Sequence, residues 1–227
     1  GEFLHFAVAD GASESMLSGK WAKILVEIFC RSEAHRTDIK DFLERAYEEW
    51  NSWKKSYLYE REERNKPIQW YEEPGLQAGA FSTFIGLTII DSQEKLSGKW
   101  EAIALGDSCL FQVRGESLMK VFPIEHSSDF NNRPLLVSSN HVRNEDVLET
   151  IKIAHGDWSI DDQFYLMTDA LAYWVLEQHE ANQTPWSILR DLDTDDQRQS
   201  FDEWISELRA RRQIRNDDVS LIGIDII

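Results

Sequence analysis

The stretch GAFSTFIGLTII at residues 79–90 marks the point where the hydrophobic pattern of this chain changes from helical to strand-like. It is rich in β-branched and aromatic residues, which favour strands. Three more strand-like segments follow after short connections, at residues 100–105, 109–113 and 118–122. Strands joined by tight turns run antiparallel, so we predict one antiparallel meander over residues 79–122.

Upstream of this meander, the pattern predicts one short strand and then two amphipathic helices. Residues 4–8 are apolar, and the run stops at Asp10-Gly11. Residues 13–30 carry apolar side chains at helical spacing, and residues 38–50 repeat that pattern after an N-cap at Thr37-Asp38. A short connection at residues 31–36 makes the pair antiparallel. The charge run at residues 60–66 has no apolar stripe and is predicted to be a solvated helix end or a loop.

Downstream of the meander, the signals weaken and then return. Residues 123–162 are predicted to be irregular, with a strand or two that the pattern does not place. Then follow a strand, a helix, a polar stretch, a helix and an apolar strand, at residues 163–167, 171–179, 180–196, 201–211 and 219–227. Helices and strands do not alternate regularly. We therefore predict an α+β fold in a single domain over residues 1–227, with helices packed outside antiparallel sheet.

The charge balance narrows the classes of partner. The chain of 227 residues has 24 Lys and Arg against 41 Asp and Glu, for a net charge of −17. Such a surface repels phosphate backbones and anionic lipid, so we expect no nucleic-acid and no membrane partner.

No apolar run reaches the length of about 18 residues that a membrane span needs. The two cysteines, Cys30 and Cys109, are far apart, and we expect free thiols in a cytoplasmic protein.

Aspartates recur where predicted strands begin or end. Asp10 follows the first strand, Asp107 lies between two strand segments, and Asp169 follows residues 163–167. Asp217 and Asp218 precede the last strand. Carboxylates at such positions are typical ligands of hard divalent cations, with water filling the remaining positions. Each aspartate is equally well explained as a turn or cap residue, so spacing alone leaves both interpretations open.

Five short motifs surround these aspartates in a definite order. They are FAVADG at residues 6–11, GAFST at 79–83, LGDS at 105–108, LMTD at 166–169 and NDDVS at 216–220. Together they resemble the metal-dependent protein serine/threonine phosphatases of type 2C, in a likeness that runs from residue 6 to residue 226. The resemblance implies a four-layer α-β-β-α sandwich, in which helix pairs flank two antiparallel sheets.

The resemblance also implies an activity and a set of ligands. Members of this family hydrolyse phosphoserine and phosphothreonine in proteins with water activated by two Mg²⁺ or Mn²⁺ ions, and no phospho-enzyme forms. Asp10 would bridge the two ions, and the Gly11 carbonyl would add an oxygen to one of them. Asp169 and Asp217 would hold the other ion, while Asp107 with Asp169 would form a weaker third site. The substrate would be a phosphoprotein.

Departures from the family pattern keep other functions open. The resemblance predicts that the family's first strand, with a further acidic ligand, is missing here. Ala12 stands where some members have histidine, and Ala170 replaces a glycine. Asp218 replaces an asparagine, and since adjacent strand residues face opposite sides, the choice between Asp217 and Asp218 stays open; the motif favours Asp217. The alternatives are a catalytically impaired module that binds phosphoproteins or regulates, and hydrolysis of small phosphate esters.

Three other kinds of site are less well supported. The motif Gly106-Asp107-Ser108 also occurs in lipase-type serine hydrolases, but the D-x-x-H pair that they need near the C-terminus is missing. Cys109 and Arg114 are one residue too close for the C-x₅-R loop of tyrosine phosphatases, so Cys109 is predicted to be a buried strand thiol. Three histidines lack the spacing of metal ligands, namely His126, His141 and His155.

Overall fold

Two four-stranded antiparallel sheets stack face to face in the computed structural model, which describes residues 3–33, 38–91, 96–131, 134–192 and 198–227. The first sheet has the order β1-β3-β4-β8, with β1 at Phe3–Val8, β3 at Phe84–Asp91, β4 at Ser97–Leu105 and β8 at Lys152–Ser159. The second has the order β10-β9-β5-β6, with β10 at Leu221–Asp225, β9 at Asp162–Met167, β5 at Cys109–Arg114 and β6 at Ser117–Phe122. A small third sheet pairs β2 (Phe81–Ser82) with β7 (Val137–Ser138).

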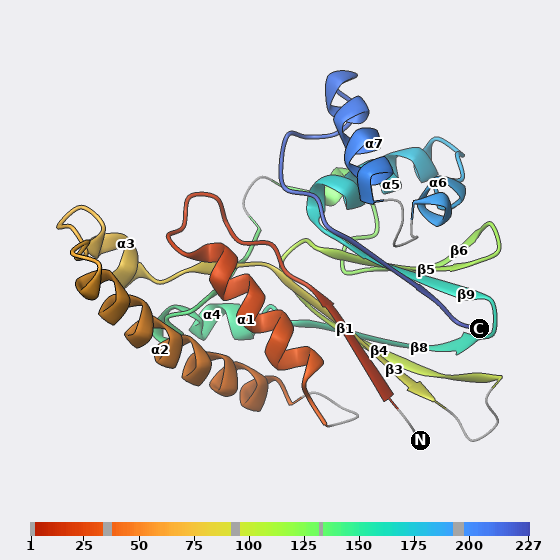
Figure 1. The fold of residues 1–227 in the computed structure, drawn as a ribbon. Coiled ribbons are helices and arrows are strands. Elements are labelled where there is room, and N and C mark those ends of the chain that lie inside the picture. The colour runs from red at the N-terminus through yellow and green to blue at the C-terminus, as the bar shows by residue number, and fades with distance from the viewer. Residues whose placement is uncertain (1–2, 34–37, 92–95, 132–133, 193–197) are drawn as a thin grey trace.

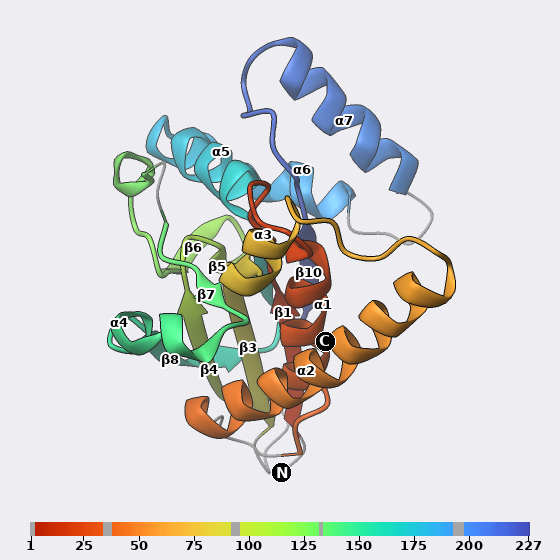
Figure 2. The ribbon, with the colours of Figure 1, turned by 90° about the vertical axis from the view of Figure 1, so that its left-hand side faces the viewer.

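Helices cover the outer faces of the two large sheets, as Figures 1 and 2 show. The first sheet carries α1 (Ser18–Cys30) and α2 (Ile39–Glu63), and the second carries α5 (Asp169–Glu180), α6 (Trp186–Asp191) and α7 (Arg198–Ala210). Short helices, α3 (Glu73–Ala78) and α4 (Glu145–Leu148), and two 3₁₀ turns, Ser127–Asp129 and His141–Arg143, lie in the connections. The predicted α+β class and its four layers are confirmed.

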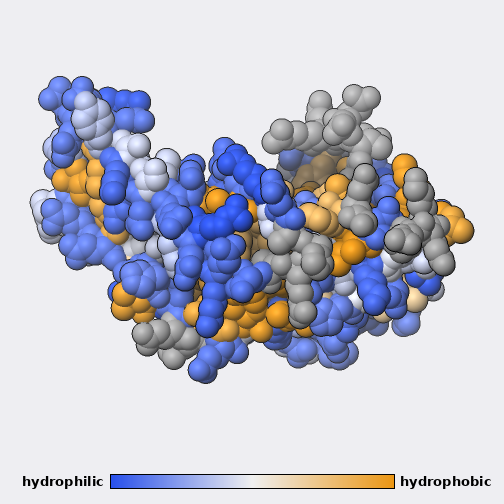
Figure 3. Space-filling view, turned by 90° about the horizontal axis from the view of Figure 1, so that it is seen from below, coloured by the Kyte–Doolittle hydropathy of each residue, from blue (hydrophilic) through white to orange (hydrophobic). Residues whose placement is uncertain are grey.

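Three apolar cores separate the four layers, because the central strands bury both of their faces. Successive side chains of a strand point to opposite sides. In β3, Phe84 packs under α1 and α2, whereas Ile85 packs between the sheets. In β9, Phe164 lies between the sheets and Tyr165 faces α5. This double burial explains why these strands are continuously apolar in sequence rather than alternating. The surface seen from below Figure 1 is largely hydrophilic, with separate apolar patches (Figure 3).

The predicted single meander is wrong. Of the strands predicted for this meander, only β3 and β4 pair with each other in the first sheet. After the turn at Gly106 the chain crosses to the second sheet, where β5 pairs with β6 and β9. The backbone at Gly106 has φ of +100°, a conformation that favours glycine. When both faces of a strand are apolar, the sequence does not show whether the next strand along the chain belongs to the same sheet. Within residues 79–90, the short strand β2 is separate from β3 and pairs with β7.

Several predicted bounds also differ from the structure. Strand β8 runs through the segment predicted to be irregular, since it is an edge strand whose side chains are mostly exposed. Helix α1 begins at Ser18 rather than at residue 13, after Leu17 in the left-handed region. Helix α2 begins after the predicted N-cap Asp38, and it runs to Glu63, so part of the charge run is a helix end. The predicted connection at residues 31–36 lies partly outside the described residues.

Three further elements differ from the pattern. The polar stretch at residues 180–196 contains α6, which buries Trp186 and Leu189, and the part of it beyond residue 192 lies outside the described residues. Helix α3 was not predicted. The final strand, β10, is shorter than the apolar run suggested.

Substitution of Gly86 is expected to destabilise the protein by about 1–3 kcal/mol. A Cβ added there would lie 2.5 Å from the ring of Phe29, which α1 buries against the first sheet and which has little room to move. The control is Gly19→Ala in α1, where an added Cβ meets nothing within 4 Å. That change should be neutral or stabilise by up to about 1 kcal/mol. Urea unfolding of Gly86→Ala and Gly19→Ala tests this, and equal stabilities would contradict the packing described here.

Two sequence expectations concern cysteines and membrane spans. Cys30 is exposed and Cys109 is buried, and both are free thiols. In the described part of the chain, no helix combines the length and the apolar character that crossing a bilayer requires.

Candidate active site

Strand directions bring the candidate aspartates to one end of the sandwich. Strands β1 and β4 both pair antiparallel with β3, so they run parallel to each other and end at the same edge, just before Asp10 and Asp107. In the second sheet, the last residue of β9 is paired with the first residues of β5 and β10. Asp169, which follows β9, therefore lies near the turn that holds Asp107 and near Asp217, which precedes β10. Asp169 is also the first residue of α5 and so does not itself end a strand.

Four aspartates line one pocket of about 540 Å³ at this end of the molecule, namely Asp10, Asp107, Asp169 and Asp217. Gly11 and the carboxylate of Glu14 line the same pocket. Asp218 lines a different pocket, beside α1. The structure thus brings together every residue that the resemblance assigned to metal binding. Of the two adjacent aspartates, Asp217 lines this pocket, whereas Asp218 lines the adjoining one, which Asp10 and Gly11 also line.

Thr83 links the loop that carries Asp10 to the turn that carries Asp107. The Asp10 amide donates to Oγ1 of Thr83 at 3.2 Å, and the Thr83 amide donates to the Asp10 carbonyl at 2.8 Å. Oγ1 of Thr83 also lies 2.9 Å from Oγ of Ser108, beside Asp107. These bonds join the end of β1 to the β4–β5 turn, so Thr83 holds two of the four aspartate backbones in fixed relation.

Thr168 has the same role on the other side of the pocket. Its hydroxyl donates to the Asp218 carbonyl at 3.2 Å and accepts from the Ser220 amide at 3.0 Å. These bonds tie the start of α5, with Asp169, to the segment that carries Asp217. Both threonines belong to the motifs of the family resemblance, but the sequence assigns neither of them a role. Thr168 directly precedes a candidate ligand, whereas Thr83 belongs to a motif that contains none.

The carboxylates raise one another's pKa values. Burial, followed by repulsion from Asp169, Asp217, Asp218 and Asp107, raises the pKa of Asp10 from 3.8 to about 7. Burial and then the charge of Asp169 raise the pKa of Asp107 to about 7 as well. The pKa of Asp169 is also raised, chiefly by burial and then by Asp217. The pocket therefore holds more negative charge than its surroundings compensate, and a divalent cation would stabilise the ionised forms.

Arg215 is the one cation among the described residues that line this pocket. Its Nη1 lies 3.9 Å from Oδ2 of Asp169, and its guanidinium lies 5.0 Å from the ring centre of Tyr173. Its charge lowers the pKa of both Asp107 and Asp169, against the stronger effect of burial. No sequence pattern singles out this residue, since it is an arginine in a loop, two positions before Asp217, outside any recognisable motif.

The donor set fits a hard divalent cation. It consists of carboxylates and a nearby backbone carbonyl, and Oδ1 of Asp169 is buried without a hydrogen-bond partner. Among the described residues, no three His, Cys, Asp or Glu side chains already form a group that could hold an ion. Binding would therefore rely on few direct ligands completed by water, which is the usual manner of Mg²⁺ in proteins.

Cys109 is unsuited to be a nucleophile. It is the fully buried first residue of β5, and its Sγ donates to the Asp107 carbonyl at 3.3 Å. Burial raises the pKa of its thiol far above the ordinary value, which disfavours the reactive thiolate. The prediction of a buried strand thiol is thus confirmed. Two of the histidines lie beside surface carboxylates instead of in the pocket, His126 by Glu180 and His155 by Glu101.

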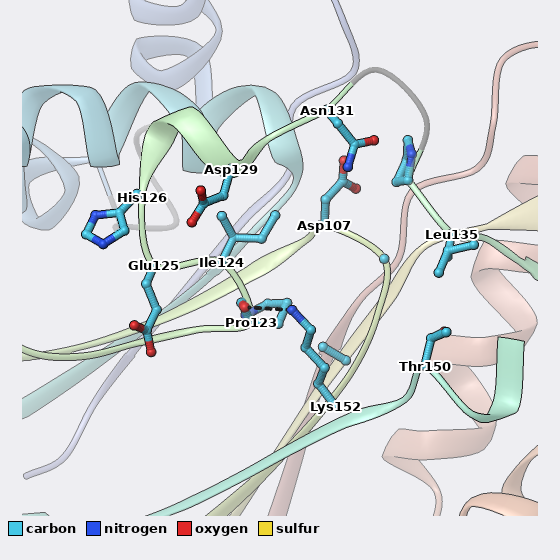
Figure 4. Close-up of a pocket in the computed structure, with 13 residues that line it drawn as sticks. Asp107, Pro123, Ile124, Glu125, His126, Asp129, Asn131, Leu135, Thr150 and Lys152 are labelled. Atoms are coloured by element: carbon cyan, nitrogen blue, oxygen red, sulfur yellow. Dashed lines mark hydrogen bonds between the residues drawn. The ribbon is translucent and has the colours of Figure 1, made fainter.

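A neighbouring pocket of about 450 Å³ continues past Asp107 (Figure 4). It shares Asp107, Asn131 and Pro134 with the carboxylate pocket. Lys152 lies on its other side, where its ammonium group donates to the Pro123 carbonyl at 3.2 Å. The space therefore extends from the carboxylates toward β8, over a surface with both apolar and charged groups.

Comparison with known proteins identifies the family. The model of the protein phosphatase 2C family matches residues 1–218. The chain belongs to the protein phosphatase 2C family. This membership confirms the resemblance on which the site residues were chosen, and it supports a protein phosphatase, and so a hydrolase, function. No curated protein sequence matches this phosphatase 2C chain significantly.

Solved phosphatase structures share the fold of this phosphatase 2C member. The serine/threonine phosphatase PstP/Ppp of Mycobacterium tuberculosis has a TM-score of 0.54 at 16% identity, covering 98% of this chain and 88% of that one. The PstP catalytic domain in complex with two manganese ions gives 0.52 at 15% identity, with coverage of 98% and 88%. A bacterial serine phosphatase gives 0.53 at 12% identity, with coverage of 98% and 86%. At such identities the likeness shows the fold alone.

Proposed function

We propose that this chain is a metal-dependent phosphatase that removes phosphate from phosphoserine and phosphothreonine in proteins. The observation that carries the proposal is the convergence of four aspartates, from four separate segments, on one pocket. The family supports it, and so does the fold shared with PstP, whose catalytic domain binds two manganese ions. The alternative of an impaired binding module gains no support from these findings.

The ion ligands would be those of the sequence hypothesis. Asp10, Gly11, Asp169 and Asp217 would hold two Mg²⁺ or Mn²⁺ ions, and Asp107 with Asp169 a weaker third. Such ions supply a Lewis acid that polarises phosphoryl oxygens and lowers the pKa of water. Thr83 and Thr168 keep the ligand segments in place through the hydrogen bonds described above.

Arg215 has a separate role toward the substrate. Its guanidinium lines the pocket beside Asp169 and is half-exposed, so it can donate hydrogen bonds to phosphoryl oxygens that enter. Tyr173 supports the guanidinium from one side through its ring. The neighbouring pocket past Asp107 gives room for peptide on one side of the phosphorylated residue.

Phosphate release from a phosphothreonine peptide tests the proposed function. We expect turnover with millimolar Mn²⁺ and none with excess EDTA. A second arm replaces the peptide by p-nitrophenyl phosphate, a small ester that reports the same chemistry without a polypeptide. Turnover that survives EDTA would refute metal dependence, and hydrolysis of the small ester alone would refute a protein substrate.

Cys109→Ala is expected to leave peptide hydrolysis within about twofold of the wild type, because the reaction needs no side-chain nucleophile. Ser108→Ala should also stay active, but at a lower rate, because it loses the hydrogen bond to Thr83 beside Asp107. Both side chains are buried, so a melting curve must accompany the rate to separate activity from loss of fold. A folded Cys109→Ala protein without activity would replace the metal mechanism by a covalent one.

A further inference from the structure

Besides the carboxylate pocket, a second cavity of about 970 Å³ is lined by residues of α5, of the end of α7 and of the segment that leads to β10. Figure 1 shows where these elements lie. Arg215 lines both cavities. A peptide with its phosphoryl group among the aspartates can therefore place a neighbouring side chain in this second cavity.

This second cavity is basic, in contrast to the protein as a whole. Three arginines line it, Arg209, Arg212 and Arg215, against a single carboxylate, that of Glu177. The whole chain has 24 basic and 41 acidic residues, so a local excess of positive charge runs against the composition. We call this cavity the arginine pocket.

The arginines of this pocket retain capacity to bind an anion. Arg212 is exposed and has no ion-pair partner within the described residues. Arg209 donates through Nη2 to the Asp217 carbonyl, but its Nε is buried and lacks a hydrogen-bond partner. Arg211, one position before Arg212, is different: it pairs with Glu207 at 3.1 Å and lines none of the pockets described here.

Stabilisation of the C-terminal end of α7 by positive charge explains the position of only one of these three arginines. Cations near a helix C-terminus interact favourably with its exposed carbonyls. That reason suits Arg209, whereas Arg212 follows the helix in the left-handed region and Arg215 lies five residues past its end. Stabilisation of the helix therefore does not explain why Arg212 and Arg215 line the same cavity.

We propose that the arginine pocket binds an acidic side chain next to the phosphorylated residue, so that the substrates of this phosphatase are acidic phosphopeptides. The proposal rests on the proposed function, because it places the phosphoryl group in the carboxylate pocket. Guanidinium groups bind carboxylates with paired hydrogen bonds. An exposed pair of this kind gives at most about a fivefold gain in affinity.

Whether the protein prefers an acidic or a neutral phosphopeptide tests the proposal, because the net charge of the protein predicts the opposite preference. A protein with a net charge of −17 repels an acidic peptide at long range. Without the arginine pocket, a neutral phosphopeptide should bind better than an acidic one. A preference for the acidic peptide must therefore come from a local group of positive charge.

The test compares two phosphothreonine peptides that differ only in two flanking residues, both Glu in one and both Gln in the other. Binding is measured by fluorescence anisotropy with Mn²⁺ on non-hydrolysable phosphonate analogues of the two peptides, and kcat/KM is measured with Mn²⁺ on the phosphopeptides. The wild type should prefer the acidic peptide by about fivefold at low salt, and about 0.5 M salt should remove the difference. Arg212→Gln should abolish the preference, Arg212→Lys should keep part of it, and the adjacent control Arg211→Gln should retain it.

Each contrary outcome has a distinct meaning. A wild type that prefers the neutral peptide, or does not bind the acidic one, overturns the inference. The same holds if Arg211→Gln and Arg212→Gln reduce the preference equally, since net charge would then explain it. Failure of both phosphopeptides to be hydrolysed refutes the proposed function, while the anisotropy comparison of the phosphonate peptides still decides the inference.

Discussion

Replacement of Asp169 by asparagine is expected to reduce Mn²⁺-dependent phosphate release by about a hundredfold or more. Asp169 lines the carboxylate pocket and has a buried Oδ1 without a hydrogen-bond partner. It is also the residue that the sequence hypothesis assigns to two ion sites. Asparagine keeps the size of the side chain but removes the charge that would attract the ions. The measurement is phosphate release from a phosphothreonine peptide over a range of Mn²⁺ concentrations.

The matched control is Asp161→Asn, at the turn between β8 and β9. Asp161 is exposed and lies at the opposite end of β9 from Asp169, so the same chemical change occurs outside the pocket. Its activity should equal that of the wild type. Asp169→Asn should also fold, because it removes a carboxyl group that burial and Asp217 hold in an unfavourable charged state. Wild-type activity in Asp169→Asn would refute the assignment of this residue to ion binding.

The metal-free protein is expected to lose stability as the pH rises from 5 to 8, and Mn²⁺ is expected to restore it. Asp10 and Asp107 have pKa values raised from 3.8 to about 7. A raised carboxyl pKa means that the folded state holds its proton more tightly than the unfolded state. The resulting stabilisation is complete below about pH 3.8 and is lost as the pH rises through about 7.

Bound Mn²⁺ should reverse this loss, because it neutralises the carboxylates that repel one another. At a hundred times its Kd, a ligand stabilises the folded state by about 2.7 kcal/mol. For a chain of this size that corresponds to a rise in Tm of about 5–10 °C. Thermal melts at pH 5 and pH 8, with Mn²⁺ or with EDTA, measure the effect, and Asp169→Asn should respond less to the metal. A Tm that depends neither on pH in EDTA nor on Mn²⁺ would contradict a cation site in this pocket.

Apolar periodicity alone predicted the helices that bury one face and expose the other. Helices α1 and α2 both show a single apolar stripe, and each buries that stripe against the first sheet. The N-cap of α2 was equally local, since the Asp38 carboxylate accepts from the amides of Lys40 and Asp41. Such features depend on residues within about one helical turn of each other, and the sequence shows these directly.

For strands with both faces buried, the pattern predicted the strand but not its sheet, and it did not place the exposed strand β8. In β3 and β5, apolar side chains occupy both faces, so nothing in their sequence shows that they belong to different sheets. Strand β8 lies at a sheet edge and is mostly exposed, which removes the alternation that would reveal it. Gly156 in β8 had no visible role either, although a Cβ there would lie 2.6 Å from the ring of Trp100.

The sequence by itself determined the α+β class, the family resemblance and the short list of aspartates, because these depend on periodicity and on motifs of four to six residues. Only the tertiary structure placed Asp10, Asp107, Asp169 and Asp217 in one pocket, with Asp218 in an adjoining pocket that Asp10 also lines. Arg215 joined them without any motif. The physical reason is strand pairing: residues up to 207 positions apart meet because antiparallel registers, such as Leu221 opposite Met167, bring strand ends together. Those registers follow from packing the whole chain, and no local segment contains them.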